Sequence, residues 1–141
     1  MKIKFKNLLD KIINEVYVIG ETKVAFVTDD KIYLMYGSGD CCATRYLADV
    51  IGDFKLLLKN PILIAEEVFF EGTEDKDPQG GNDSWYFYKI STIKEHLTMR
   101  WNYSDSFDYG GYSTSVDLNV ISKAKLKNIL NKNNYKKYEI T

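Results

Sequence analysis

The chain has 141 residues, 45% of them apolar, and a formal net charge of −1. This composition excludes a disordered chain, and the near-zero charge gives no electrostatic footprint for a DNA or RNA polymer. No apolar run approaches the ~20 residues of a membrane span, and Asp10, Lys11, Asn14 and Glu15 interrupt any signal-peptide core. We therefore expect a single domain over residues 1–141, located in the cytoplasm.

The first third of the chain is predicted to form strands with alternating apolar residues. Three strands are expected, over residues 12–19, 23–28 and 31–36. Asp29-Asp30 joins the last two as a tight hairpin. A short strand over 43–47 is expected to follow a turn at Gly37-Ser38-Gly39, in which Gly37 or Gly39 takes a positive φ.

A central helix is predicted over residues 50–59. Asp49 is its expected N-cap, and the Pro61 that follows Asn60 ends it. The apolar residues that favour this helix have helical spacing; they are Val50, Ile51, Phe54, Leu57 and Leu58.

The second half is predicted to contain strands, a loop and a final helix. A strand over 62–70 precedes an exposed acidic loop over 72–84, and 85–93 pairs with 97–103 as an aromatic-rich hairpin. A strand over 112–120 follows a polar loop, and Ser122 caps a last helix over 123–131 before a polar tail. The fold class is therefore α+β, a largely antiparallel meander sheet with one central and one C-terminal helix.

Asp40, Cys41 and Cys42 form the most unusual segment, because adjacent cysteines rarely form a disulfide and rarely both bind one tetrahedral ion. A cysteine nucleophile needs a base, and the sequence does not bring His96 to this turn. We expect two reduced thiols with a packing role and no metal, with metal or redox chemistry and nucleophilic catalysis as the alternatives.

The only two arginines, Arg45 and Arg100, are candidates for bidentate contacts with phosphate or carboxylate. Arg100 lies between Met99 and Trp101 and should face away from both. Structural ion pairs are the alternative: Arg45 with Asp40 or Asp49, and Arg100 with an acid on a neighbouring strand. Glu66 and Glu67 point to opposite faces of one strand, and one of them is the expected partner of Arg100.

Aromatic residues are dense in the second half of the chain. If the hairpin over 85–103 alternates, half of its rings lie on its outer face, where they mark an interface or a stacking platform. We expect a homo-oligomer that forms through this hairpin. The candidate ligand-binding residues are Asp40, Arg45, Tyr46, Arg100, Trp101, Tyr109 and Tyr112.

An ordered series of motifs resembles a family of small, uncharacterised phage and prophage proteins. The series spans residues 39–101 and consists of an Asp-Cys-Cys turn at 40–42, Pro61-Ile62 followed by Ala65-Glu66-Glu67, an aromatic strand at 85–88 and Arg100-Trp101. Ala43 stands where the pattern has an acid. The resemblance implies no activity; it implies a phage protein that works in a bacterial cytoplasm.

The function expected from these observations is non-covalent binding without a cofactor. Its sharpest form is a sponge that sequesters a nucleotide signal of host defence, with arginines on the phosphates and aromatic rings on the bases. One alternative is a protein-binding inhibitor of a host defence enzyme. Another is a metal-dependent phosphodiesterase that degrades the signal.

Overall fold

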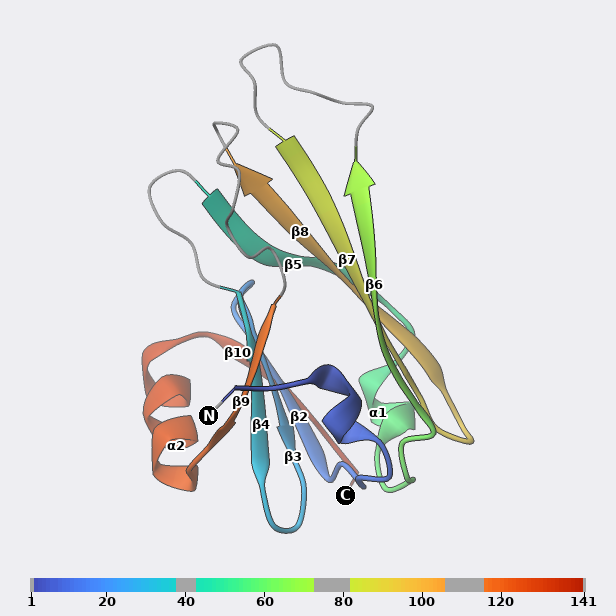
Figure 1. The fold of residues 1–141 in the computed structure, drawn as a ribbon. Helices are drawn as coiled ribbons and strands as arrows, with labels where there is room; N and C mark the ends of the chain where they lie inside the picture. Colours follow the sequence, from blue (N-terminus) through green and yellow to red (C-terminus); the bar gives the residue numbers. More distant parts are fainter. Residues whose placement is uncertain (1, 38–42, 73–81, 106–115, 141) are drawn as a thin grey trace.

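The computed structural model describes residues 2–37, 43–72, 82–105 and 116–140. The expected turn residues Gly39, Asp40, Cys41 and Cys42 lie outside the described residues, as do Tyr109 and Tyr112. The described part forms two antiparallel sheets that face each other, and a helix covers the far side of one of them (Figure 1).

The larger sheet has six strands in the order β1-β9-β4-β3-β2-β10, all antiparallel to their neighbours. The strands are β1 (Lys2–Ile3), β2 (Glu15–Ile19), β3 (Lys23–Val27), β4 (Ile32–Tyr36), β9 (Asp117–Ile121) and β10 (Tyr135–Glu139). The predicted hairpin at Asp29-Asp30 is confirmed, because Val27 pairs with Ile32 and the Thr28 amide donates to the Lys31 carbonyl at 2.9 Å.

The smaller sheet has four strands in the order β5-β8-β7-β6. The strands are β5 (Ala43–Ile51), β6 (Ile64–Gly72), β7 (Asn82–Ser91) and β8 (His96–Asp105). The predicted aromatic hairpin is confirmed as β7 and β8. Its alternation buries Tyr88 and Trp101 against the larger sheet.

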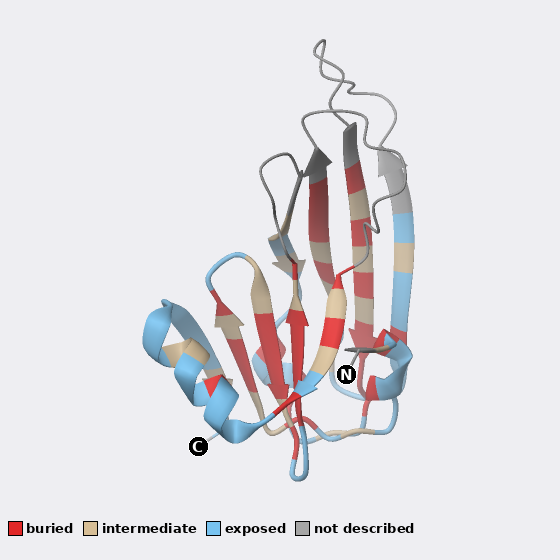
Figure 2. Cartoon of the chain, turned by 60° about the vertical axis from the view of Figure 1, so that its left-hand side comes forward, coloured by how far each residue is buried: buried red, intermediate tan, exposed pale blue. Residues whose placement is uncertain are grey.

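One apolar core fills the space between the sheets. Its largest members come from both sheets and include Phe26, Met35, Tyr88 and Trp101, each no more than 1% exposed. The 3₁₀ helix η1 (Phe5–Leu8) and the short helix α1 (Phe54–Leu57) add Phe5, Leu8, Phe54 and Leu57 to this core. The burial colours of Figure 2 follow the same pattern, with buried residues concentrated where the sheets face each other.

Helix α2 (Lys123–Lys132) packs on the outer side of the six-stranded sheet. Leu126 and the half-buried Ile129 and Leu130 join a second apolar cluster there. The predicted cap is confirmed, since the Ser122 hydroxyl accepts the Lys125 amide at 3.1 Å. The larger sheet is thus covered on both faces.

The coarse α+β class is confirmed, but the single meander sheet was wrong. The chain divides its strands between two sheets, because β5 pairs with β8 and leaves the neighbourhood of β4. The polar tail, for which no strand was predicted, also forms a strand: β10 pairs with β2 along five residues, and Tyr138 packs on Phe54 with ring centroids 5.3 Å apart.

The predicted helix over residues 50–59 is reduced to four residues. Val50 and Ile51 belong to β5, where they pair with Met99 and Thr98. Gly52, with a φ of +121°, lets the chain leave the strand, and Asp53 rather than Asp49 caps α1 by accepting the Lys55 amide at 2.9 Å. The β-branched side chains favour the strand once β8 offers a partner.

A positive φ was expected at Gly37 or Gly39; Gly37 does not have one, and Gly39 lies outside the described residues. Gly37 is instead required for a close approach of two strands. A Cβ atom at this position would lie 2.6 Å from the Arg45 carbonyl oxygen and 2.7 Å from the Arg45 Cβ. The positive φ values of described glycines belong to Gly20 and Gly52. Gly37 therefore lets the end of β4 pass against β5.

Candidate functional site

Arg45 lies on the inner face of the four-stranded sheet. It pairs across the strands with Tyr103, which is 3% exposed, and its guanidinium lies 5.6 Å from the centre of the Tyr103 ring. Its charge also lowers the pKa of Tyr86, although burial outweighs it and the net effect raises that pKa to about 12. Arg45 thus belongs to the aromatic interior between the sheets.

Arg100 lies on the outer face of the same sheet, opposite Met99 and Trp101 as predicted. Its Nε–H donates to Asp49 Oδ1 at 2.6 Å, and its Nη2 contacts Asp49 Oδ2, so the pair is bidentate. The hydrogen bond from Arg100 lowers the pKa of the Asp49 carboxyl. The guanidinium also lies 5.5 Å from the centre of the Trp85 ring.

The expected pairing of Arg100 with Glu66 or Glu67 was wrong, but the alternative, an ion pair with an acid on a neighbouring strand, is confirmed by Asp49. The cross-strand register places Asp49 of β5 opposite Arg100, whereas Glu66 lies opposite Lys89. Glu66 and Glu67 do point to opposite faces, as predicted: Glu67 pairs with Tyr88, whose ring faces the core.

The candidate ligand-binding residues do not form one site. Tyr46 pairs with Asn102, two residues from Arg100 on the outer face, while Trp101 is 0% exposed in the core beside Leu47. A ligand on the outer face can reach Tyr46 and Arg100, but neither Arg45 nor Trp101. The sheet itself separates the two pairs of residues.

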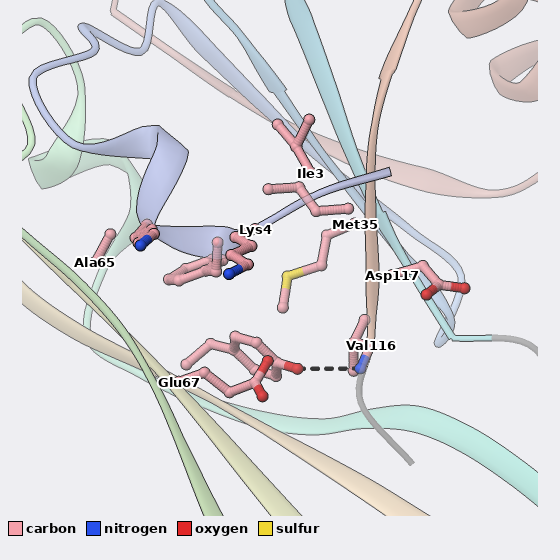
Figure 3. Close-up of a pocket in the computed structure, with 11 residues that line it drawn as sticks. Ile3, Lys4, Met35, Ala65, Glu67, Val116 and Asp117 are labelled. Carbon is pink, nitrogen blue, oxygen red and sulfur yellow. Dashed lines mark hydrogen bonds between the residues drawn. The ribbon is translucent and has the colours of Figure 1, made fainter. Parts of the chain in front are cut away.

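A cavity of about 520 Å³ lies between the two sheets, beside the N-terminal segment. Apolar and aromatic side chains form most of its wall, among them Phe5, Met35, Tyr88 and Leu118 (Figure 3). The Phe5 and Tyr88 rings meet edge to face, with centroids 5.0 Å apart. This is the size and character of a small-molecule pocket.

Polar groups converge at one side of this cavity. The Tyr88 hydroxyl accepts the Val116 amide at 3.0 Å, and the Glu67 carboxylate lies beside it (Figure 3). Burial, with hydrogen bonding and charge from Glu67, raises the pKa of Tyr88. Tyr88 is therefore a neutral hydroxyl that holds the start of β9 and orients toward a carboxylate.

Two lysines contribute positive charge to the rim. Lys4 and Lys6 are exposed and line the cavity from the N-terminal segment. Asp117 also lines it, but Figure 3 shows its carboxylate on the far side of the strand from Glu67. The rim thus combines two cations with a single inward carboxylate, that of Glu67.

Sequence reasoning missed this cavity. The alternation of β7 indicates that Tyr86 and Tyr88 face inward, and the register of β6 then adds Glu67. No short pattern, however, indicates that Phe5 and its neighbouring lysines pack beside β6. That placement depends on contacts between segments about 60 residues apart.

A serine and the histidine lie together at the β7–β8 hairpin. Ser91 Oγ and His96 Nδ1 share a hydrogen bond, but Ser91 is only 6% exposed. The Glu95 carboxylate accepts the backbone amides of Asp53 and His96 and does not orient the imidazole. The arrangement ties the hairpin to the start of α1.

Among the described residues, no three His, Cys, Asp or Glu side chains gather in a group that could hold a metal ion. Nor does this part of the chain contain a helix long and apolar enough to span a membrane.

Comparison with protein families gives one match. The profile described as "Domain of unknown function (DUF7448)" matches residues 6–118. The chain belongs to this family. Comparisons with curated proteins and with solved structures gave no match.

The matched DUF7448 region contains the whole four-stranded sheet and, from the six-stranded sheet, β2, β3, β4 and the start of β9. It begins within η1 and ends in β9, so Lys6, Glu67 and Tyr88 of the cavity lie inside it. Helix α2 and strand β10 lie beyond it. The cavity is thus formed largely by the family domain, while Lys4 and Phe5 come from just outside the match.

Proposed function

We propose that this protein acts by non-covalent capture of a small phosphate-bearing ligand in the cavity between its sheets. The ligand we propose is a nucleotide signal of host defence, sequestered by a phage-encoded sponge. The observation that carries the proposal is the combination of a cavity of about 520 Å³, aromatic walls and two rim lysines.

The size of the cavity suits a nucleotide-sized molecule. Small-molecule pockets have volumes of roughly 300–1,000 Å³ and combine apolar walls with a few polar groups. Phe5 and Tyr88 are 6% and 1% exposed and contact each other edge to face, so they give a base an apolar wall rather than a stacking platform.

The polar groups of the cavity suit a ligand that has an anionic group at one end and hydrogen-bond donors at the other. Lys4 and Lys6 can meet phosphate oxygens as flexible point charges. The inward Glu67 carboxylate can accept hydrogen bonds from an amino or hydroxyl group of a base or ribose. A nucleotide carries both ends, whereas a simple anion would be repelled by Glu67.

This proposal replaces the expected arginine clamp. Arg45 and Arg100 lie on opposite faces of the four-stranded sheet, and Arg100 already binds Asp49 through two contacts. The lysines at the rim therefore take the role first assigned to the arginines. The sponge chemistry itself, which is binding without turnover, is unchanged.

The experiment that tests this function is ligand recovery. The purified protein is incubated with cyclic nucleotides and ADP-ribose derivatives, separated from free ligand, heated and analysed by chromatography. A sponge releases its ligand intact. Release of a converted product would instead support a phosphodiesterase, and the absence of any bound ligand would support an inhibitor of a host protein.

A matched pair of charge variants assigns the binding to the cavity. The double variant Lys4→Glu/Lys6→Glu reverses both rim charges and should abolish recovery. The control Lys31→Glu/Lys55→Glu makes the same change at two exposed lysines away from the cavity. Equal recovery from both double variants would contradict the assignment.

A further inference from the structure

We propose that the outer face of the four-stranded sheet is the interface of a homodimer. We define this face as the outward side chains of the three central rows of the sheet, with Tyr46, Asp49, Trp85, Phe87 and Arg100 at its centre. Asn102 points the same way but is only 3% exposed. The inference goes beyond the ligand cavity and does not depend on it, because the cavity lies on the other face of the sheet.

The strand register shows that these side chains share one face. Asp49, Arg100, Phe87 and Val68 form one row across the four strands. The flanking rows follow the same alternation: Tyr46, Asn102 and Trp85 on one side, and Ile51, Thr98, Lys89 and Glu66 on the other. Met99 and Trp101, between them along β8, face the core.

The two sheets differ in what covers their outer sides. Helix α2 packs on the six-stranded sheet, but Figures 1 and 2 show no described helix or strand on the outer face of the other sheet. Tyr46, Trp85 and Phe87 remain only half buried there. Aromatic residues are enriched in protein interfaces, where such rings become fully buried.

The charges of this face favour a second copy over a polyanion. Asp49 and Glu66 balance Arg100 and Lys89, so the face carries no net charge. Nucleic acid requires a basic surface, whereas an isologous contact requires self-complementarity. A neutral face with mixed charges meets the second requirement.

Such a contact forms if the two sheets face each other across a two-fold axis. The axis lies in the plane between the sheets, runs parallel to the strands and is midway between β7 and β8. It places β7 of one copy on β8 of the other, so Arg100 meets Phe87 of the partner copy and Lys89 meets Thr98. Asp49 then lies over Val68 and Glu66 over Ile51. This arrangement sets no two like charges opposite each other and allows a cation–π contact at its centre.

The size of the face also suits a dimer. Four strands spaced about 4.8 Å apart and about seven residues of about 3.4 Å each give a footprint of about 20 by 24 Å. Protruding side chains raise its accessible area, which is of the same order as the roughly 800 Å² that each partner buries in a stable interface.

The two tryptophans allow a test without any substitution. Trp101 is fully buried in the core, while Trp85 lies half buried on the proposed interface. Diluting the wild-type protein from 100 µM to 10 nM should therefore shift the emission of Trp85 to longer wavelength as the dimer dissociates. The variant Trp85→Phe should show no shift. A wild-type protein with the 16.3 kDa mass of one chain at 100 µM, measured by light scattering, would overturn the proposal.

A pair of charge insertions locates the interface. Phe87→Lys puts an ammonium group at the centre of the face, opposite Arg100 of the partner copy, and should raise the dimer dissociation constant at least 100-fold. The control Leu9→Lys makes the same kind of change at a residue that is 40% exposed after η1, and should leave the dimer intact. A folded Phe87→Lys protein that still dimerises like the control would show that another surface forms the interface. If this variant does not fold, the wild-type dilution alone decides whether the dimer exists and buries Trp85.

Discussion

Arg45 and Arg100 lie on opposite faces of the four-stranded sheet, although their cross-strand partners, Tyr103 and Asp49, lie on the same pair of strands. Each side chain stacks on an aromatic ring of its own face, Arg45 on Tyr103 and Arg100 on Trp85. A single ligand cannot reach both guanidiniums. The two arginines therefore have separate roles, one in the interior and one on the outer surface.

The Asp49–Arg100 pair predicts a small, acid-sensitive contribution to stability. Arg100 lowers the pKa of Asp49 in the folded state, so the contribution exists above the unfolded value of about 3.9 and disappears as pH falls through the lower folded value. Asp49→Asn should therefore melt slightly below the wild type at pH 7 and together with it near pH 2. A larger difference at pH 2 than at pH 7 would contradict this sign.

Tyr88→Phe should destabilise the protein by about 1–3 kcal/mol, because it leaves the buried Val116 amide without its acceptor. Urea unfolding at pH 7 measures the loss, with Tyr46→Phe on the outer face as the control. An unchanged midpoint for Tyr88→Phe would mean that another acceptor replaces the hydroxyl.

Alkaline pH should unfold the protein through its buried tyrosines. The folded pKa of Tyr86 is raised to about 12, and that of Tyr88 is raised as well. Their neutral forms stabilise the fold fully below the unfolded pKa of about 10, and this stability is lost as pH rises above that value. Absorbance at 295 nm should therefore show some tyrosinates forming only when circular dichroism reports unfolding. Complete ionisation of a folded protein near pH 10 would refute this.

Gly37→Ala should cost about 1–3 kcal/mol, the usual effect of overpacking. The added methyl group would lie 2.6 Å from a backbone oxygen of β5, which cannot move without disturbing the strand. Thermal unfolding checks the effect. Wild-type stability in this variant would show that β4 and β5 do not approach so closely.

Tyr138→Ala should destabilise the fold by about 1–3 kcal/mol, because the Tyr138 ring packs against Phe54 of the core. Tyr135→Ala is the matched control on the same strand, because Tyr135 is 49% exposed. The two variants are compared by urea unfolding, and equal losses would argue against a structural role for the inward face of β10.

Local patterns were sufficient to predict the hairpins and the last helix. Alternation defined β7 and β8, Asp29-Asp30 defined the β3–β4 turn, and Ser122 defined the start of α2. Each of these features depends on residues close together in sequence. Hydrogen bonds between such residues therefore determine the two hairpins and the start of α2.

Contacts between distant parts of the chain determine the features that the sequence did not predict, which are the length of β5, the strand β10 and the cavity. Val50 and Ile51 fit a helix by spacing, but β8 provides strand partners for both of them. The polar tail gave no strand prediction, yet its residues 135–139 pair with β2, and Tyr138 reaches Phe54. Both outcomes depend on partners at least 45 residues away, as does the packing of the N-terminal segment at the cavity.

The central claim is that a phosphate-bearing nucleotide binds in the cavity between the sheets. Titration calorimetry with cyclic nucleotides and ADP-ribose derivatives tests it most directly, using the wild type, Lys4→Glu/Lys6→Glu and Lys31→Glu/Lys55→Glu. We expect one member of the panel to bind the wild type and the control with a nanomolar dissociation constant, which a sponge needs to compete with a receptor, and to show no binding to the rim variant. Absence of binding across the whole panel, or nanomolar binding that survives reversal of both rim charges, would contradict the claim.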